Sequence, residues 1–226
     1  MSIKSWGQSL WQEWIRPLII MIIVIGSMRS ALADWNDVPT GSMKPTIVEG
    51  DRVIVNKLAY DLKIPFTTVH VAEWDNPERG DIVVFFSPAD EKRLVKRVVG
   101  LPGDLVELRD NSLLINGNPA AYAPVEDSLP SSFSNPHMIS KETLGAMSHP
   151  IMTSPLLPAV RTFGPLVIPD GHYFVMGDNR DNSYDSRFIG PIARKRIVGK
   201  AVGVAFSLDR ERYFKPRAQR FFRSLL

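Results

Sequence analysis

Short β-branched segments separated by turn residues are the feature that most limits how this chain can fold. Runs rich in Val and Ile, each bounded by Gly, Pro or Asp, occupy residues 51–57, 81–87, 94–99, 105–108, 172–176 and 197–206. Segments of this length and composition are typical of strands. Residues 113–115 are followed by Asn116-Gly117, a strong signal for a tight hairpin. The sequence therefore predicts a mainly β fold.

The β pattern is interrupted between residues 106 and 166. This stretch holds 8 of the 18 prolines together with 8 serines, and beyond the hairpin it shows little periodicity. We interpret it as an insertion that starts with the hairpin and continues as long loops. A chain of 226 residues is long enough for one core with such an insertion. The predicted units are a core formed by 34–105 and 167–208, the insertion 106–166 and a tail 209–226.

The N-terminal 33 residues contain an apolar run at 17–28, preceded by Lys4 and Arg16. Twelve apolar residues suit the core of a signal peptide, whereas the 20 residues from 14 to 33 are enough to span a bilayer. Ala31-Leu32-Ala33 also resembles a small-x-small cleavage site. A cleaved signal peptide and a retained signal anchor therefore both remain open. Because the cations precede the apolar run, either one places the body from residue 34 onward outside the cytoplasm.

The net charge of +3 is concentrated at the C-terminus. From residue 209 onward there are six cations against two anions, interleaved with aromatic side chains. Such a tail suits an anionic lipid surface, and it also suits a solvated terminal helix. No nucleic-acid-binding motif accompanies it, so nucleic acid is not expected as a partner. The chain has no cysteine, which excludes disulfides, cysteine-ligated metals and thiol catalysis.

Two segments offer a nucleophile and a base. In 39–46, Gly41 and Pro45 bracket Ser42 in a turn of the kind that exposes a hydroxyl, although such a turn can be purely structural. In 93–104, strand alternation places Lys96 on the same face as two aliphatic residues. Burial there would favour a neutral amine, which is a usable general base. A solvated lysine on an edge strand is the alternative.

A third segment, 177–190, is rich in carboxylates. The spacing of a calcium-binding loop fails because Arg180 takes a ligand position and the required glycine is missing. An ion pair between Asp185 and Arg187 that fixes a neighbouring hydroxyl fits the segment better. No metal and no other cofactor is expected, since the histidines also lack metal-ligand spacing.

The order of residues along the chain narrows the catalytic schemes. All four histidines follow Ser42, which excludes the His-Asp-Ser and Asp-His-Ser orders with this nucleophile. No G-x-S-x-G motif is present. A serine paired with a lysine is the scheme that remains.

Segments 39–46, 50–57, 79–88, 96–104 and 177–190 resemble, in order, the signature boxes of bacterial type I signal peptidases. The most specific are KR-V-V-G-L-P-G-D and GDNRDNS-x-DSR. The resemblance implies a signal-peptidase-like β fold with an N-terminal transmembrane anchor and an inserted subdomain. It also implies a Ser/Lys endopeptidase of the plasma membrane, with an extracytoplasmic catalytic domain. Its partners would be preprotein signal peptides and membrane lipid.

The same resemblance implies roles for individual residues. Ser42 would be the nucleophile and Lys96 the general base, while the Thr40 hydroxyl and the Ser42 N–H would form the oxyanion hole. Ser183 would hydrogen-bond the lysine amine, supported by the Asp185–Arg187 pair. Small-residue specificity would come from the side chains along the substrate path, which are Val38, Pro39, Met43, Leu94 and Val95.

Two alternative functions remain compatible with these residues. One is a specialised Ser/Lys peptidase that serves a single substrate, for example in a conjugation system. The other is an inactive membrane-tethered binding module on the same fold. The presence of Ser42, Lys96 and Ser183 together argues against the inactive module.

Overall fold

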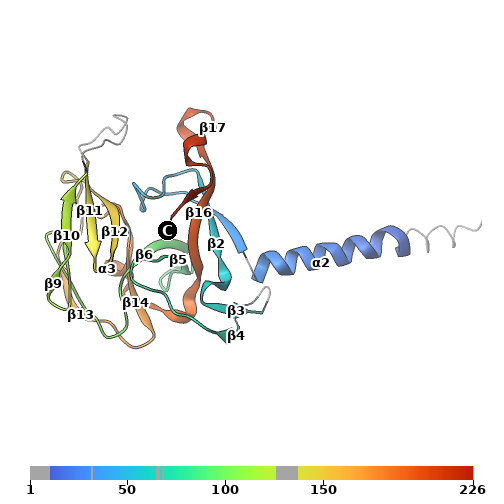
Figure 1. Ribbon diagram of the computed structural model, residues 1–226, viewed down its shortest axis with the longest axis horizontal. Helices are drawn as coiled ribbons and strands as arrows, with labels where there is room; N and C mark the ends of the chain where they lie inside the picture. Colours follow the sequence, from blue (N-terminus) through green and yellow to red (C-terminus); the bar gives the residue numbers. More distant parts are fainter. Residues whose placement is uncertain (1–10, 32, 65–66, 68, 126–136, 226) are drawn as a thin grey trace, which may run out of the picture.

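The computed structural model describes residues 11–31, 33–64, 67, 69–125 and 137–225. A π-helical turn, η1 (Trp11–Ile15), leads into the helix α2 (Arg16–Ala31). Figure 1 shows α2 extending away from the strands. Within the described ranges, no helix combines the length and the apolar character needed to span a membrane. After α2 the regular structure of the described residues consists almost entirely of strands, so the mainly β prediction is confirmed.

A nine-stranded sheet forms the centre of the molecule, with the order β1-β2-β16-β5-β6-β14-β15 and with β17 and β18 pairing with β16. Its strands are β1 (Ala33–Asp37), β2 (Asp51–Asn56), β5 (Ile82–Phe86), β6 (Arg93–Gly100), β14 (His172–Met176), β15 (Ile192–Ala193), β16 (Ile197–Asp209), β17 (Lys215–Pro216) and β18 (Arg223–Ser224). The strands predicted at 51–57, 81–87, 94–99, 172–176 and 197–206 are all present. Burial explains this success, because Val83, Val84 and Phe85 are fully buried and a strand covered on both faces is apolar throughout.

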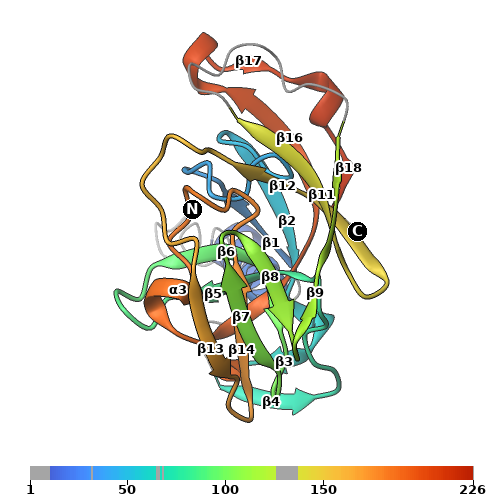
Figure 2. The ribbon, with the colours of Figure 1, turned by 90° about the vertical axis from the view of Figure 1, so that its left-hand side faces the viewer.

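The inserted segment adds two further sheets, which face the viewer in Figure 2. One has the order β13-β7-β8-β9 and the other β10-β11-β12. Their strands are β7 (Leu105–Arg109), β8 (Ser112–Ile115), β9 (Asn118–Pro119), β10 (Ala121–Pro124), β11 (Met138–Leu144), β12 (Met147–Thr153) and β13 (Phe163–Val167). The predicted hairpin is confirmed, with Asn116 and Gly117 both at positive φ between β8 and β9.

The expectation of long loops after this hairpin is wrong for residues 138–153, which form the antiparallel pair β11 and β12. The sequence hides this hairpin because two of its inward positions are polar. Glu142 and His149 face each other in the register and are both buried. An apolar alternation is therefore missing where a half-buried strand normally shows one. The Ser-rich part of the insertion, 126–136, lies outside the described residues.

The basic tail packs on the sheet and is not a terminal helix. β17 and β18 both pair with β16, and two 3-10 turns, Arg210–Arg212 and Ala218–Arg220, connect them. The Arg220 guanidinium makes a two-pronged ion pair with the buried carboxylate of Asp51 at 2.6 and 3.0 Å. Three of the tail's four aromatic side chains remain exposed, namely Tyr213, Phe214 and Phe222, whereas Phe221 is half-buried against Phe206.

The remaining elements are short. β3 (Asp61–Lys63) and β4 (His70–Glu73) form a separate two-stranded sheet. Two more 3-10 turns cover Lys57–Ala59 and Arg194–Arg196. The four-residue helix α3 (Ser186–Ile189) follows β14 and begins inside the carboxylate-rich segment.

Candidate active site

The Ser42 turn lies between β1 and β2 and is held by the core beneath it. Met43 and Ile47 are buried in a cluster with Val38, and the Ile47 N–H donates to the Met43 carbonyl at 2.9 Å. The Lys44 N–H donates to the Gly41 carbonyl and closes the turn. Ser42 itself is half-buried. The apolar neighbours therefore fix the backbone and leave the serine side chain at the edge of the cluster.

Lys96 reaches this turn from β6, where it lies opposite Val83 of β5. Its Nζ is 2.7 Å from the Ser42 Oγ and 3.0 Å from the Val95 carbonyl oxygen, and the residue is 3% exposed. Burial lowers the pKa of Lys96 to about 8, although Asp185 and Asp178 oppose the shift. Of the two alternatives for Lys96, burial and a solvated place on an edge strand, the structure shows burial, because β6 lies between β5 and β14. An amine with this pKa is neutral in about half of the molecules at pH 8 and can accept a proton.

The loop after β14 supports the Ser42 turn from another side. The Asn179 N–H donates to the Ser42 carbonyl at 3.1 Å, and the Asn179 side-chain amide donates to the Gly41 carbonyl at 3.0 Å. Gly177 allows the close approach. A Cβ at this position would lie 2.4 Å from the Ser42 carbonyl oxygen and 2.3 Å from the Ser183 Oγ. Only glycine fits between the two segments without a shift of one of them.

Asp185 and Arg187 form the ion pair that the sequence predicts. Two guanidinium nitrogens of Arg187 lie 2.8 and 2.9 Å from the two carboxylate oxygens of Asp185. Asp185 also caps the N-terminus of α3 and accepts a hydrogen bond from the Gly177 N–H. Burial alone would raise the pKa of Asp185, but the Arg187 guanidinium and the Gly177 N–H hold it below its usual value. Arg187 in turn donates to the carbonyls of Val160 and Arg180. The pair fixes the loop next to Lys96.

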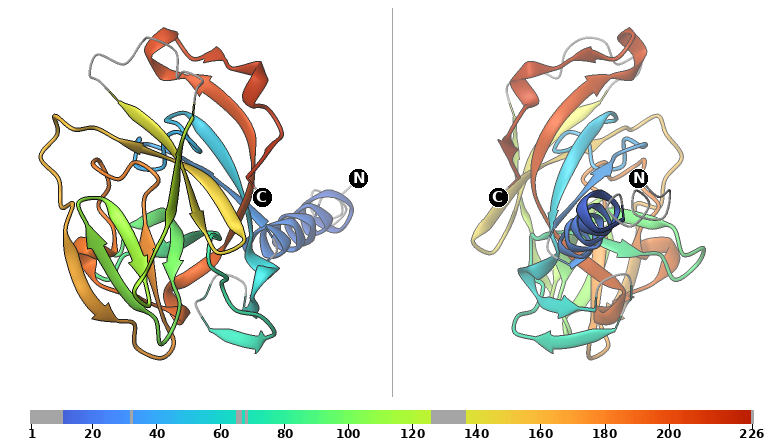
Figure 3. Two further views of the ribbon diagram at one scale, coloured as in Figure 1. Left: turned by 60° about the vertical axis from the view of Figure 1, so that its left-hand side comes forward. Right: turned by 90° about the vertical axis from the view of Figure 1, so that its right-hand side faces the viewer.

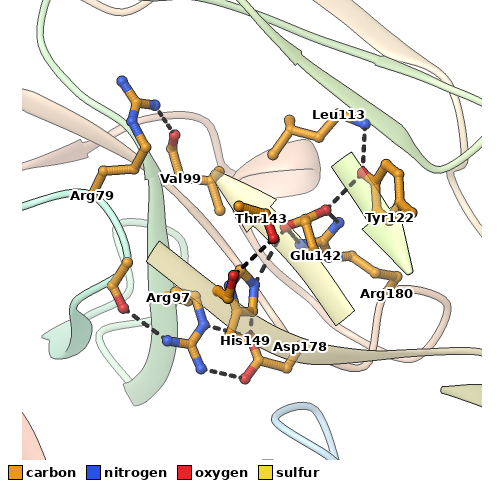
Figure 4. Close-up of polar contacts among 12 residues, drawn as sticks. Arg79, Arg97, Val99, Leu113, Tyr122, Glu142, Thr143, His149, Asp178 and Arg180 are labelled. Carbon is orange, nitrogen blue, oxygen red and sulfur yellow. Dashed lines mark hydrogen bonds and ion pairs between the residues drawn. The ribbon is translucent and has the colours of Figure 1, made fainter. Parts of the chain in front are cut away.

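A second buried ion pair, which the sequence analysis did not assign, joins Arg97 to Asp178. Arg97 Nε and Nη2 are 2.8 and 2.7 Å from the two carboxylate oxygens, and Arg97 Nη1 donates to the Gly80 carbonyl (Figure 4). Thr46 also donates to this carboxylate. Burial alone would raise the pKa of Asp178, but Arg97 and the other donors hold it below the usual value. Both residues stand in the quoted motifs, yet no local spacing indicates that they meet.

The other predicted site residues fall into two groups. Val38 and Met43 share one apolar cluster, and Val95 packs against it, whereas Leu94 packs against a different cluster that contains Phe85. Thr40 and Pro39 are exposed beside Ser42.

Ser183 differs from the expectation. Its Oγ is buried without a hydrogen-bond partner, so the predicted bond to Lys96 is not formed in this structure.

The carboxylates of segment 177–190 are engaged by guanidinium groups. Asp178 pairs with Arg97, Asp185 with Arg187, and Asp181 with Arg161 at 3.2 Å. Within the part of the chain that the structure describes, no three His, Cys, Asp or Glu side chains are grouped as a metal site would require.

The Ser42 hydroxyl lies next to a buried lysine whose pKa is lowered, and an amine of this kind can activate a nucleophile. Residues 11–206 match the family described as signal peptidase, peptidase S26. The chain therefore belongs to the S26 signal peptidase family and is a hydrolase of the serine peptidase type.

Individual relatives of this chain are also named signal peptidase I. Signal peptidase I of Pseudomonas fluorescens is 38% identical over 203 residues, which cover 84% of this chain and 70% of the relative. Signal peptidase I P of Bacillus subtilis subsp. natto is 33% identical over 204 residues, covering 90% and 93%. A crystal structure of a signal peptidase I from Enterococcus faecalis has 32% sequence identity to this chain. The match covers 56% of this chain and 97% of the chain in that crystal structure. Its TM-score against this chain is 0.35.

Replacing Gly177 by Ala should lower peptidase activity by about 100-fold, since the new Cβ must displace either the Ser42 carbonyl or Ser183. The measurement is the rate of peptide cleavage, with thermal unfolding recorded alongside. The matched control is Gly203→Ala on β16, where the Cβ would meet the Arg223 carbonyl at 3.2 Å. Gly203→Ala should retain activity within about twofold. Full activity in Gly177→Ala would contradict the tight contact described here.

Proposed function

We propose that this protein is a membrane-anchored signal peptidase that removes N-terminal signal peptides from exported preproteins after small-x-small sites. In this proposal Ser42 is the nucleophile and Lys96 the general base. The observation that carries it is the 2.7 Å contact between the Ser42 Oγ and a buried amine whose pKa is lowered to about 8, in a chain of the S26 family.

The reaction runs in two halves. Neutral Lys96 accepts the Ser42 hydroxyl proton while Oγ attacks the substrate carbonyl, and the tetrahedral oxyanion receives hydrogen bonds from the Ser42 N–H and the Thr40 hydroxyl. Lys96 then gives its proton to the leaving amine as the peptide bond breaks. A water molecule transfers a proton to Lys96 and attacks the acyl ester, and the proton returns to Ser42 as the new carboxyl group leaves.

The supporting residues act on the lysine and on the loop. Asp185 raises the pKa of Lys96 and Arg187 lowers it, so the pair limits the net charge felt by the amine while it anchors the loop. The unpartnered hydroxyl of Ser183 is suited to accept a hydrogen bond from the lysine when it becomes an ammonium during the reaction.

Substrate selection follows from the side chains beside the dyad. Val38, Met43 and Val95 lie in one apolar cluster next to Ser42. Pro39 follows Val38 in the sequence, and Leu94 precedes Val95. In this proposal, these aliphatic side chains form the walls beside the nucleophile and admit only small substrate side chains. This is the physical basis of the small-x-small specificity in the proposal.

The N-terminal helix supports attachment to the plasma membrane. η1 and α2 run without interruption through 5 and 16 residues, and α2 carries the apolar run at 17–28. In Figure 3 this helix is seen to extend away from the body. Its large apolar side chains are exposed, among them Trp11, Trp14, Leu18, Ile20 and Ile22.

The orientation and the lipid contacts complete the proposal. The cations before the apolar run place the N-terminus in the cytoplasm and the catalytic domain on the extracytoplasmic side, with a single membrane pass. The exposed aromatic residues of the basic tail, Tyr213, Phe214 and Phe222, would lie against lipid head groups, where aromatic and cationic side chains are both favoured.

The proposed function predicts site-specific cleavage of preproteins. The detergent-solubilised chain should cleave several unrelated preproteins, and sequencing of the new N-termini should place each cut after a small-x-small site. Ser42→Ala should be inactive at equal folding. Cleavage of one preprotein alone would favour the specialised peptidase, and absence of cleavage by the folded wild-type chain would favour the inactive binding module.

A second prediction concerns the pH dependence of the base. The neutral amine is the active form, so kcat/KM should fall about tenfold per pH unit below pH 8 and level off above it. Lys96→Met should lose at least 100-fold in rate, because general-base catalysis contributes about 10²–10⁴-fold. Because a buried amine is easier to accommodate when uncharged, this variant should unfold at a temperature no lower than wild type at pH 7. A flat pH profile would rule out Lys96 as the base.

A third prediction concerns the N-terminus. Membrane fractions should hold the full-length chain, and carbonate extraction should not release it. Ala33 and Asp34 pair with Asn56 and Val55 of β2, so the peptide bond between them lies within a strand ladder and is shielded from cleavage. A chain that begins at residue 34 should be extractable and serves as the control. Finding mainly a soluble form starting at Asp34 in cells would instead identify a cleaved signal peptide.

A further inference from the structure

The β11–β12 hairpin of the inserted segment packs directly on the loop that supports Ser42. The Met152 N–H donates to the Asp178 carbonyl and the Arg180 N–H donates to the Met152 carbonyl, both at 2.8 Å. Met152 and Asn179 thereby form a parallel bridge. The Ser154 N–H donates to the carboxylate of Asp181 at 2.8 Å. The end of β12 is thus paired with residues 178–181 by main-chain and side-chain hydrogen bonds.

The opposite side of this loop contacts the nucleophile's own backbone. Asn179 donates to the carbonyls of Ser42 and Gly41 through its main-chain and side-chain N–H groups. Residues 178–180 therefore lie between the hairpin on one side and the Ser42 turn on the other. Because both contacts involve the same three residues, a shift of the hairpin is transmitted to the turn.

Buried side chains reinforce the hairpin's hold on the loop. Arg180 forms a two-pronged ion pair with Glu142 of β11, and both side chains are almost completely buried (Figure 4). The Tyr122 hydroxyl donates to the same carboxylate at 2.7 Å. Burial alone would raise the pKa of Glu142, but Arg180 and His149 hold it well below its usual value. Glu142 therefore stays ionised and keeps Arg180 in place.

His149 connects this ion pair to the one beside Lys96. It lies opposite Glu142 in the hairpin register and is 4% exposed. Its Nε2 is 3.3 Å from Glu142 Oε2 and 3.9 Å from Asp178 Oδ1. The imidazole thus lies between the carboxylates of Glu142 and Asp178. Glu142 is also paired with Arg180, and Asp178 with Arg97. Arg97 is the chain neighbour of Lys96, so the contacts run from the hairpin to the base.

We propose that Glu142 and His149 are positioning residues for the Ser42–Lys96 site, which they serve by holding residues 178–180 against the Ser42 turn. Neither residue touches the reacting atoms. This role builds on the proposed function, since it concerns the same dyad. The positioning role explains why buried positions of the hairpin hold polar residues. A buried ion pair contributes little net stability, but it is directional and fixes one arrangement of the loop.

The first test separates turnover from substrate binding. Glu142→Gln and His149→Ala should each lower kcat by about 10- to 100-fold, since a displacement of about 1 Å at a catalytic centre costs about 100-fold. KM should change less than kcat, because Leu94 and Val95 of the substrate path lie on β6, outside the Ser42 turn and outside residues 178–180. His149→Gln keeps a polar N–H group and should recover part of kcat. Wild-type kcat in a folded Glu142→Gln variant would overturn the proposal.

A double variant separates positioning from stability. Glu142→Met combined with Arg180→Met replaces the buried pair by apolar side chains, an exchange that is often neutral or stabilising. This variant should unfold at a temperature close to that of wild type and should still have a low kcat. Recovery of both the unfolding temperature and kcat would show that the pair serves stability alone. The matched control is Ser148→Ala on the same hairpin, an exposed residue whose hydroxyl bonds to that of Thr143, and it should keep full activity.

Amide hydrogen exchange gives a readout that does not depend on cleavage. In Glu142→Gln, and in the double Met variant, exchange should accelerate in residues 178–182 and also in residues 41–47. Acceleration confined to the hairpin would overturn the positioning role even if every variant is inactive. Failure of the wild-type chain to cleave preproteins, with the exchange pattern as expected, would instead count against the proposed function.

Discussion

The site depends on the burial of the Lys96 amine without a hydrogen bond to a carboxylate. The groups that hydrogen-bond to Lys96 are the Ser42 hydroxyl and the Val95 carbonyl, both of which are neutral. Desolvation therefore dominates and lowers the pKa of Lys96 to about 8. Two carboxylates lie near enough to oppose this shift, and each is occupied by an arginine, Asp185 by Arg187 and Asp178 by Arg97. If either were free to bind the amine, the lysine would stay charged and could not accept a proton.

The arginine pairs therefore have an electrostatic role beyond holding the chain together. The pKa values of Asp178 and Asp185 are both lowered, so both carboxylates are ionised throughout the range in which Lys96 titrates. Their contribution to stability is complete above the pKa of an ordinary aspartate and is lost only as the pH falls through their lowered values. Titration of the lysine thus takes place beside two carboxylates whose charges do not change. The amine can be neutral while these ion pairs remain intact.

The sequence predicts those parts of the fold that are governed by apolar burial. Strands such as β5, β6 and β14 were recognised because their side chains are buried and β-branched, and the hairpin at Asn116-Gly117 was recognised because its turn requires positive φ. The β11–β12 hairpin was missed because its buried positions hold Glu142 and His149. The motifs predict that Ser42 and Lys96 meet, and the polar loop at 177–190 predicts the Asp185–Arg187 pair. The Arg97–Asp178 pair joins positions 81 residues apart, and no local pattern encodes such a contact.

The boundary that composition draws around residues 106–166 does not separate two independent parts of the structure. Asp178 and Arg180 follow the core strand β14, yet their main-chain groups bond to Met152 of the hairpin. Without the hairpin, the buried guanidinium of Arg180 would lose Glu142, and an unpaired buried charge is strongly destabilising. The loop that supports Ser42 is thus completed by a segment that lies far away in the sequence. Because these polar groups must be satisfied from both sides, the β10-β11-β12 sheet is part of the hydrogen-bonding structure that holds the loop after β14.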